Sequence, residues 1–88
     1  MKNTTMLEVA SKFVLDNPNQ AFEFYQIFDK VEEELNDLWI KRLLFKSDDN
    51  SYEQIRERKM GELYRLLSVD KTFLRNEDGT WSARHKNF

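Results

Sequence analysis

Apolar side chains recur at the spacing of an α-helix along the first part of the chain. Thr5-Met6-Leu7-Glu8 has the form of a capping box, in which the Thr and Glu side chains satisfy free N–H groups at a helix start. The apolar positions that follow predict a helix over about 5–16. Asn17-Pro18-Asn19 ends this helix, because the residue before a proline avoids the α region.

The second helical pattern is the clearest and predicts a helix over about 24–45. Its apolar residues fall within an arc of about 120° when each residue is turned by about 100° from the last. They are Phe24, Ile27, Phe28, Val31, Leu35, Leu38 and Trp39. Glu32-Glu33-Glu34 is predicted to be solvated helix surface, because runs of exposed charge are ordinary there.

The end of this pattern, "LWIKRLLF" over 38–45, is apolar nearly all round. Three explanations are open: a second element covers it, the helix bends, or it is an apolar patch for a partner. We favour cover within the molecule, because large exposed apolar patches are uncommon on monomers.

A third helix is predicted over about 51–67, after a polar loop at 46–50. Ser51-Tyr52-Glu53-Gln54 forms a second capping box at its start. Its apolar side contains Ile55, Met60, Leu63, Leu66 and Leu67.

Short strands are predicted on either side of the two long helices. Residues 21–24 alternate between apolar and polar, and a hairpin is predicted over about 72–84. Its turn is either a two-residue Asp78-Gly79 turn, or a type I turn at Glu77-Asp78 followed by Gly79 in the left-handed region. We favour the second register, because it places Phe73, Trp81 and Ala83 on one face.

The order helix, strand, helix, helix, hairpin predicts an α+β fold that is mostly helical. If the strand at 21–24 pairs with the hairpin, the result is a winged helix-turn-helix with three helices and a small antiparallel sheet. We expect one domain over 1–88, because the chain is too short for two cores.

Composition narrows the class of protein. The chain has no cysteine, which excludes disulfides and thiolate zinc sites and fits a cytoplasmic location. No apolar run approaches the roughly 18 residues that a membrane span requires. The net charge is only −2, so the overall charge does not indicate nucleic acid or membrane as a partner.

Catalytic and cofactor motifs find no support in the sequence. His85 is the single histidine, so neither a nucleophile–histidine pair nor a two-histidine metal site is indicated. Only Gly61 and Gly79 are glycines, which excludes a glycine-rich phosphate loop. We therefore expect a non-catalytic protein without cofactor or metal.

Three segments carry a family resemblance. "LEVASKFVLDN", "AFEFYQIFDKV" and "MGELYRLLSVDKTFLRNEDGTWSAR" follow in the order of the first helix, first strand with second helix, and third helix with wing of a known module. The chain resembles the N-terminal winged-helix domain, of the HARE-HTH type, of the bacterial RNA polymerase delta subunit. The connection around 38–50 is longer than is usual in that family.

The resemblance implies an accessory subunit domain that docks on core RNA polymerase and modulates transcription and nucleic-acid release. The family's displacement of nucleic acid is associated with an acidic tail beyond this domain, so for these residues the resemblance implies docking. We expect a monomer in isolation, with weak or indirect binding of nucleic acid and no membrane contact.

Charge arrangement, rather than a family motif, indicates the residues of the interaction surface. The basic candidates are Arg58, Arg65, Arg75, Arg84, His85 and Lys86. The expected core and wing residues are Phe24, Phe28, Leu63, Phe73, Gly79 and Trp81.

Two other functions compete with polymerase docking. The first is that of a winged-helix DNA-binding regulator, whose recognition helix would here be the third helix. Glu57 and Glu62 lie among its arginines and would oppose phosphates. The other is an interaction module that holds a partner helix through "LWIKRLLF".

Overall fold

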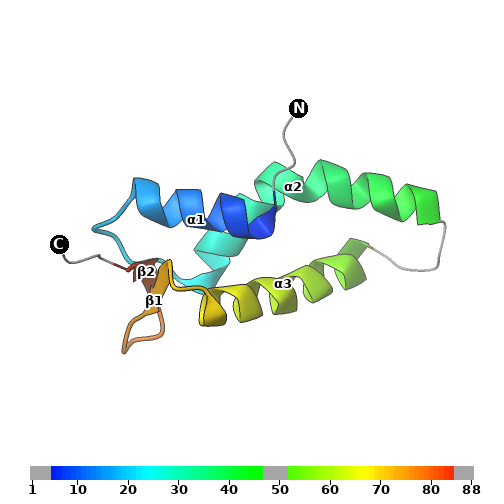
Figure 1. The fold of residues 1–88 in the computed structure, drawn as a ribbon. Coiled ribbons are helices and arrows are strands. Elements are labelled where there is room, and N and C mark those ends of the chain that lie inside the picture. The colour runs from blue at the N-terminus through cyan, green and yellow to red at the C-terminus, as the bar shows by residue number, and fades with distance from the viewer. Residues whose placement is uncertain (1–4, 47–51, 85–88) are drawn as a thin grey trace.

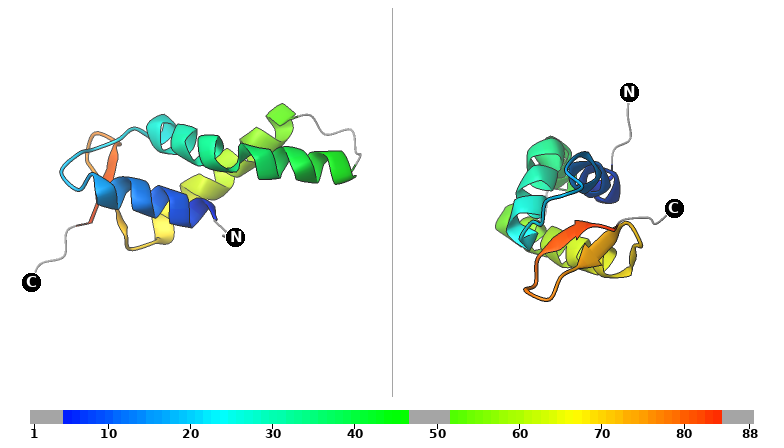
Figure 2. Two further views of the ribbon diagram at one scale, coloured as in Figure 1. Left: turned by 90° about the horizontal axis from the view of Figure 1, so that it is seen from above. Right: turned by 90° about the vertical axis from the view of Figure 1, so that its left-hand side faces the viewer.

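The computed structural model describes residues 5–46 and 52–84, which form three helices and a two-stranded antiparallel sheet. The elements are α1 (Met6–Asp16), α2 (Phe24–Lys46), α3 (Tyr52–Val69), β1 (Phe73–Arg75) and β2 (Trp81–Ala83). α1 and α2 lie on one side of the molecule, and α3 and the hairpin on the other (Figures 1 and 2). The predicted α+β, mostly helical class is confirmed, and the arrangement is winged-helix-like.

The strand predicted at 21–24 is reduced to one residue. Phe22 and Trp81 form an isolated antiparallel bridge, with N–H to carbonyl distances of 2.7 Å in both directions. The next residue already belongs to the start of α2: the Glu23 N–H donates to the Gln26 side chain at 2.8 Å, and the Glu23 carbonyl accepts from the Gln26 N–H at 2.9 Å. The three-stranded sheet is therefore a two-stranded sheet with a single bridge beside it.

Local signals place the ends of α1 as predicted. Thr5 Oγ1 accepts from the Glu8 N–H at 3.1 Å, and Glu8 Oε1 accepts from the Thr5 N–H at 3.0 Å, which completes the capping box. At the other end, Asn17 Nδ2 donates to the Phe13 carbonyl oxygen at 2.9 Å before the chain turns at Pro18. The second predicted capping box begins at Ser51, and the loop before it at 46–50 extends past Lys46; both reach outside the described residues.

The core lies between the two sides and receives side chains from every element. Phe28 and Leu63 are fully buried, and Phe73 and Trp81 are 2% and 3% exposed. Phe24 is half-buried and packs against the core from the first turn of α2. These five members of the expected core set thus meet in one cluster.

The hairpin adopts the favoured register. Phe73 pairs with Ala83, Leu74 with Ser82 and Arg75 with Trp81. The Gly79 N–H donates to the Asn76 carbonyl oxygen at 3.0 Å, which closes a turn centred on residues 77 and 78. Gly79 has φ +89°, the left-handed conformation that glycine adopts without a steric penalty.

Asp78 stabilises this turn from the side. Its carboxylate accepts from the Thr80 hydroxyl at 2.7 Å and from the Thr80 N–H at 3.0 Å. These two hydrogen bonds lower the pKa of Asp78 below its ordinary value, because they favour the ionised carboxylate.

α2 extends past the N-terminal end of α1, as Figures 1 and 2 show. Trp39 is 4% exposed, with its ring stacked 6.1 Å from that of Phe28 and the Lys59 ammonium 5.9 Å from its centroid. Leu38 and Ile40 are 43% and 41% exposed. Cover within the molecule therefore holds for Trp39 and was wrong for Leu38 and Ile40, while the side chains of 42–45 lie outside the described ones.

Glu32 corrects the expectation for the acidic run of α2. Its side chain is only 20% exposed, and its Oε2 accepts from Tyr52 Oη at 2.7 Å and from Arg56 Nε at 2.9 Å. The Arg56 guanidinium also lies 5.1 Å from the centroid of the Phe28 ring. We call Glu32, Tyr52 and Arg56 the α2–α3 clamp.

Burial and the Glu32 carboxylate raise the pKa of Tyr52 to about 12, because both disfavour the phenolate. Glu33 and Glu34 do remain on the surface, where each forms an ion pair with Lys30. The prediction of solvated surface thus holds for two of the three glutamates.

Candidate interaction surface

The outer face of α3 carries a line of exposed residues opposite the core. Arg58, Gly61 and Arg65 are exposed, whereas Leu63 and Leu67 on the other side of the helix are buried. Positions that alternate by four and three residues stay on one face of an α-helix. This line, which we call the α3 stripe, contains Gln54, Arg58, Gly61, Arg65 and Ser68.

The two arginines of the α3 stripe differ from the other cations of the helix. Arg56 pairs with Glu32 at 2.9 Å, and Lys59 pairs with Glu62 at 3.7 Å. Within residues 5–46 and 52–84, no ion pair involves Arg58 or Arg65. Their charges are therefore available to a binding partner.

Gly61 lies in the interior of α3, between the two arginines. A Cβ atom added there would meet nothing within 4 Å, so no packing within the described chain requires a glycine. Glycine in a helix interior is less stable than alanine by about 0.5–1 kcal/mol. The outer face of α3 is thus open at its centre, at a cost to the helix that no internal contact explains.

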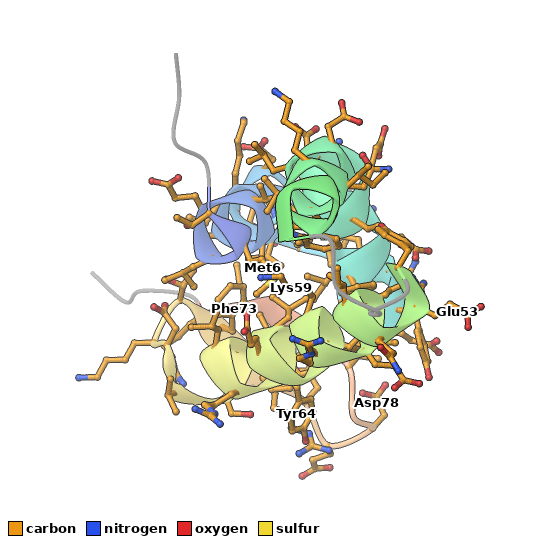
Figure 3. All side chains as sticks on the ribbon, turned by 90° about the vertical axis from the view of Figure 1, so that its right-hand side faces the viewer. Met6, Glu53, Lys59, Tyr64, Phe73 and Asp78 are labelled. Atoms are coloured by element: carbon orange, nitrogen blue, oxygen red, sulfur yellow. The ribbon has the colours of Figure 1, made fainter. Side chains whose placement is uncertain are left out.

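Tyr64 connects α3 to the wing. Its hydroxyl accepts from Arg75 Nη1 at 3.1 Å, and its ring meets the Trp81 ring edge-on at 6.0 Å. The Arg75 guanidinium lies 6.0 Å from the Tyr64 ring centroid and 5.7 Å from that of Trp81. The Tyr64 ring also meets that of Phe24 in α2 edge-on at 5.9 Å, and Figure 3 shows Tyr64 on the side of α3 where Asp78 of the hairpin lies.

The predicted surface is therefore divided by the structure. Arg58 and Arg65 share one line of α3. Arg75 is held beside that helix by its hydrogen bond to Tyr64. Arg84 stabilises the hairpin instead. Its side-chain Nε donates to the Lys71 carbonyl oxygen at 2.9 Å, and its backbone N–H donates to the Thr72 carbonyl oxygen at 2.8 Å. His85 and Lys86 lie outside the described residues.

Two features of this surface escaped the sequence analysis. Gly61 entered only the argument against a glycine-rich phosphate loop, although the helical pattern already showed an exposed glycine between Arg58 and Arg65. Tyr64 follows the buried Leu63 and is 43% exposed, and no local signal pairs it with a strand eleven residues later.

A concave surface of the described residues lies away from the α3 stripe. A groove of about 450 Å³ lies between α1, α2 and α3, with Met6, Leu38, Trp39 and Lys59 among its lining residues. Lys59 points toward this space, near Met6 (Figure 3). Across the described part of the chain, no three His, Asp or Glu side chains are grouped as a metal site would require.

The described helices do not include one that is long and apolar enough to cross a membrane.

Comparisons of the chain with protein-family models, with curated proteins and with solved structures found no match.

Proposed function

We propose that this chain is a non-catalytic accessory domain that docks on core RNA polymerase and thereby modulates transcription. The α3 stripe and the adjoining wing strand are the docking surface. The identity of the partner rests on the resemblance of the three segments to the delta-subunit domain. The observation that carries the docking surface is that Arg58 and Arg65 face outward from α3 without an ion pair among the described residues.

Contacts between the wing and α3 support this role. Arg75 and Tyr64 tie β1 to α3 through a hydrogen bond and ring contacts, so α3 and the wing present one preorganised surface. A surface that is already ordered loses less conformational entropy on binding.

A protein partner fits the charges of α3 better than duplex DNA does. Glu57 and Glu62 are exposed on either side of the α3 stripe. A phosphate backbone is anionic throughout and would be repelled by Glu57, and less strongly by Glu62, which is paired with Lys59 at 3.7 Å. A protein surface has both signs of charge and can match the arginines and the glutamates together.

Binding of purified core polymerase to the immobilised chain tests the proposal. The double variant Arg58→Ala/Arg65→Ala should raise the Kd about tenfold, from two exposed charge pairs of roughly 0.7 kcal/mol each. Lys12→Ala/Lys41→Ala is the matched control, because it removes two exposed positive charges from α1 and α2 and should leave the Kd unchanged.

Failure of the wild-type chain to bind polymerase, whether immobilised by its N- or C-terminus, would contradict the proposal. An equal loss in the control variant would contradict the assignment of the surface.

A DNA-binding regulator is the second candidate, favoured by the same two arginines on the helix that reads DNA in winged-helix proteins. We expect weak binding to duplex DNA even at low salt. A steep fall of the association constant with salt, equivalent to several neutralised phosphates, would favour this candidate over polymerase docking.

A further inference from the structure

We infer that the α3 stripe binds an α-helix of its partner, and that this helix carries acidic residues seven positions apart on the facing line and basic or neutral residues beside them. The inference rests on the proposed docking function and names the partner element that the surface fits. Three observations support it: the spacing of the arginines, the open backbone at Gly61, and the order of charges across the face of α3.

The spacing of the two arginines matches a helix. Arg58 and Arg65 are seven residues apart, which is about 10.5 Å along the axis of α3. A partner helix that runs along α3 repeats its facing side chains after seven residues at the same distance. An extended strand repeats them at about 6.8 Å and 13.6 Å, so it meets one arginine at a time.

Gly61 allows such a helix to approach closely. It lies three residues after Arg58 and four before Arg65, and the space where its Cβ would lie is empty to 4 Å. The backbone of α3 is therefore exposed at the middle of the contact line. A residue that disagrees with its local structure and has no internal reason is expected at a functional site.

The order of charges selects the partner's sequence. The line Arg58, Gly61 and Arg65 is positive, whereas Glu57 on one side is negative, and Glu62 on the other side is negative but paired with Lys59 at 3.7 Å. A helix with acids on its central line and lysines beside them satisfies both. A uniformly acidic helix, like nucleic acid, is repelled at the flanks.

The test uses a synthetic Ala-rich peptide of about 24 residues, long enough to be helical in water. It carries two Glu residues seven positions apart with Lys residues on both flanks. Binding to the whole 88-residue chain is measured by fluorescence anisotropy of the labelled peptide, beside a scrambled peptide of the same composition. We expect the ordered peptide to bind at least tenfold more tightly than the scrambled one.

Gly61→Leu separates docking from folding. Leucine favours the helix and meets no atom within 4 Å, so the melting temperature should stay equal or rise. The same side chain blocks close approach, so the Kd for the ordered peptide should rise at least tenfold. Lys41→Leu adds an exposed leucine to α2 as the matched control and should bind the peptide like the wild type.

A charge exchange completes the test. Arg58→Glu/Arg65→Glu should lose the original peptide and bind a peptide in which the two Glu are replaced by Lys. The inference is overturned if the ordered peptide does not bind at concentrations up to about 1 mM, if the scrambled peptide binds equally well, or if Gly61→Leu binds the ordered peptide as tightly as the wild type does.

Polymerase binding distinguishes this inference from the proposed function. If core polymerase binds Gly61→Leu and the wild type equally, the helix-docking inference fails and polymerase docking stands. If polymerase does not bind the wild type while the peptides behave as expected, polymerase docking fails and the acidic-helix site stands.

Discussion

Trp81→Ala tests whether the wing and the three helices form one folded unit. The Trp81 side chain is 3% exposed and meets Tyr64 of α3 edge-on at 6.0 Å. Its backbone forms the bridge to Phe22, which the substitution leaves in place. The change therefore removes side-chain packing while keeping the hydrogen bonds of the hairpin.

The expected loss is large for a protein of this size. A tryptophan buries about 200 Å², which at roughly 25 cal/mol per Å² corresponds to about 5 kcal/mol as an upper figure. Truncations of large aromatic residues in cores cost about 3–5 kcal/mol. An 88-residue domain has a free energy of unfolding of roughly 4–13 kcal/mol, so the variant loses a substantial part of it.

Urea and thermal unfolding, both followed by circular dichroism, measure this loss. A loss of 3 kcal/mol lowers the melting temperature by at least about 12 °C. Trp81→Phe is the control, because it keeps a buried ring and should lose less than half as much. A melting temperature unchanged in Trp81→Ala would refute the reasoning and show that the wing folds apart from the helices.

Three further predictions concern the hairpin and the α2–α3 clamp. Gly79→Val should destabilise the chain by at least about 1–2 kcal/mol in urea unfolding, because its φ of +89° lies in the left-handed region; equal stability would show that the turn changes type. Glu32→Ala should cost about 1–3 kcal/mol, because it leaves Tyr52 and Arg56 without their acceptor, and Glu33→Ala, on the exposed side, should be near neutral. Because the pKa of Tyr52 is raised to about 12 in the folded state, the folded chain holds a proton that the unfolded chain releases, so stability should fall between pH 10 and 12. Tyr52→Phe should remove this part of the fall, and the same pH profile in both proteins would contradict the assignment.

Local signals in the sequence predicted the elements and the hairpin register. The capping box at Thr5, the stop at Pro18 and the turn at Gly79 depend on hydrogen bonds or backbone preferences within a few residues. Such interactions depend on neighbouring residues of the sequence and not on where other elements lie. The elements themselves agree with their predicted bounds to within two residues, apart from the strand at 21–24.

The strand at 21–24 and Leu38 were predicted wrongly for a shared reason. The alternation at 21–24 and the helical arc at Leu38 each predicted which side chains face inward. A neighbouring element then determined whether the strand forms and whether Leu38 is covered. Glu23 forms hydrogen bonds with the first turn of α2, and Leu38 lines the groove beside the first residues of α1, which leave it 43% exposed. The lengths of neighbouring elements are tertiary facts that periodicity does not contain.

Contacts distant in sequence explain what was missed at the candidate surface. Tyr64 meets Arg75 eleven residues later, and Glu32 meets Tyr52 twenty residues later. Both pairs depend on how α3 is placed against the wing and against α2. The helical pattern shows which residues are exposed, but not which exposed residue another element will reach.

The arginines of the chain show how this placement bears on function. Counted by charge, Arg56, Arg58, Arg65 and Arg84 are equivalent, and three of them were predicted to form one binding surface. In the structure Arg56 is taken by Glu32 and Arg84 by backbone carbonyl groups of the wing, so these two stabilise the fold. Arg58 and Arg65 have no such partner among the described residues, and the residue midway between them is the glycine that destabilises its own helix. A docking site explains the unpaired charges and the glycine together, whereas a merely solvated helix face explains the charges and leaves the glycine without a reason.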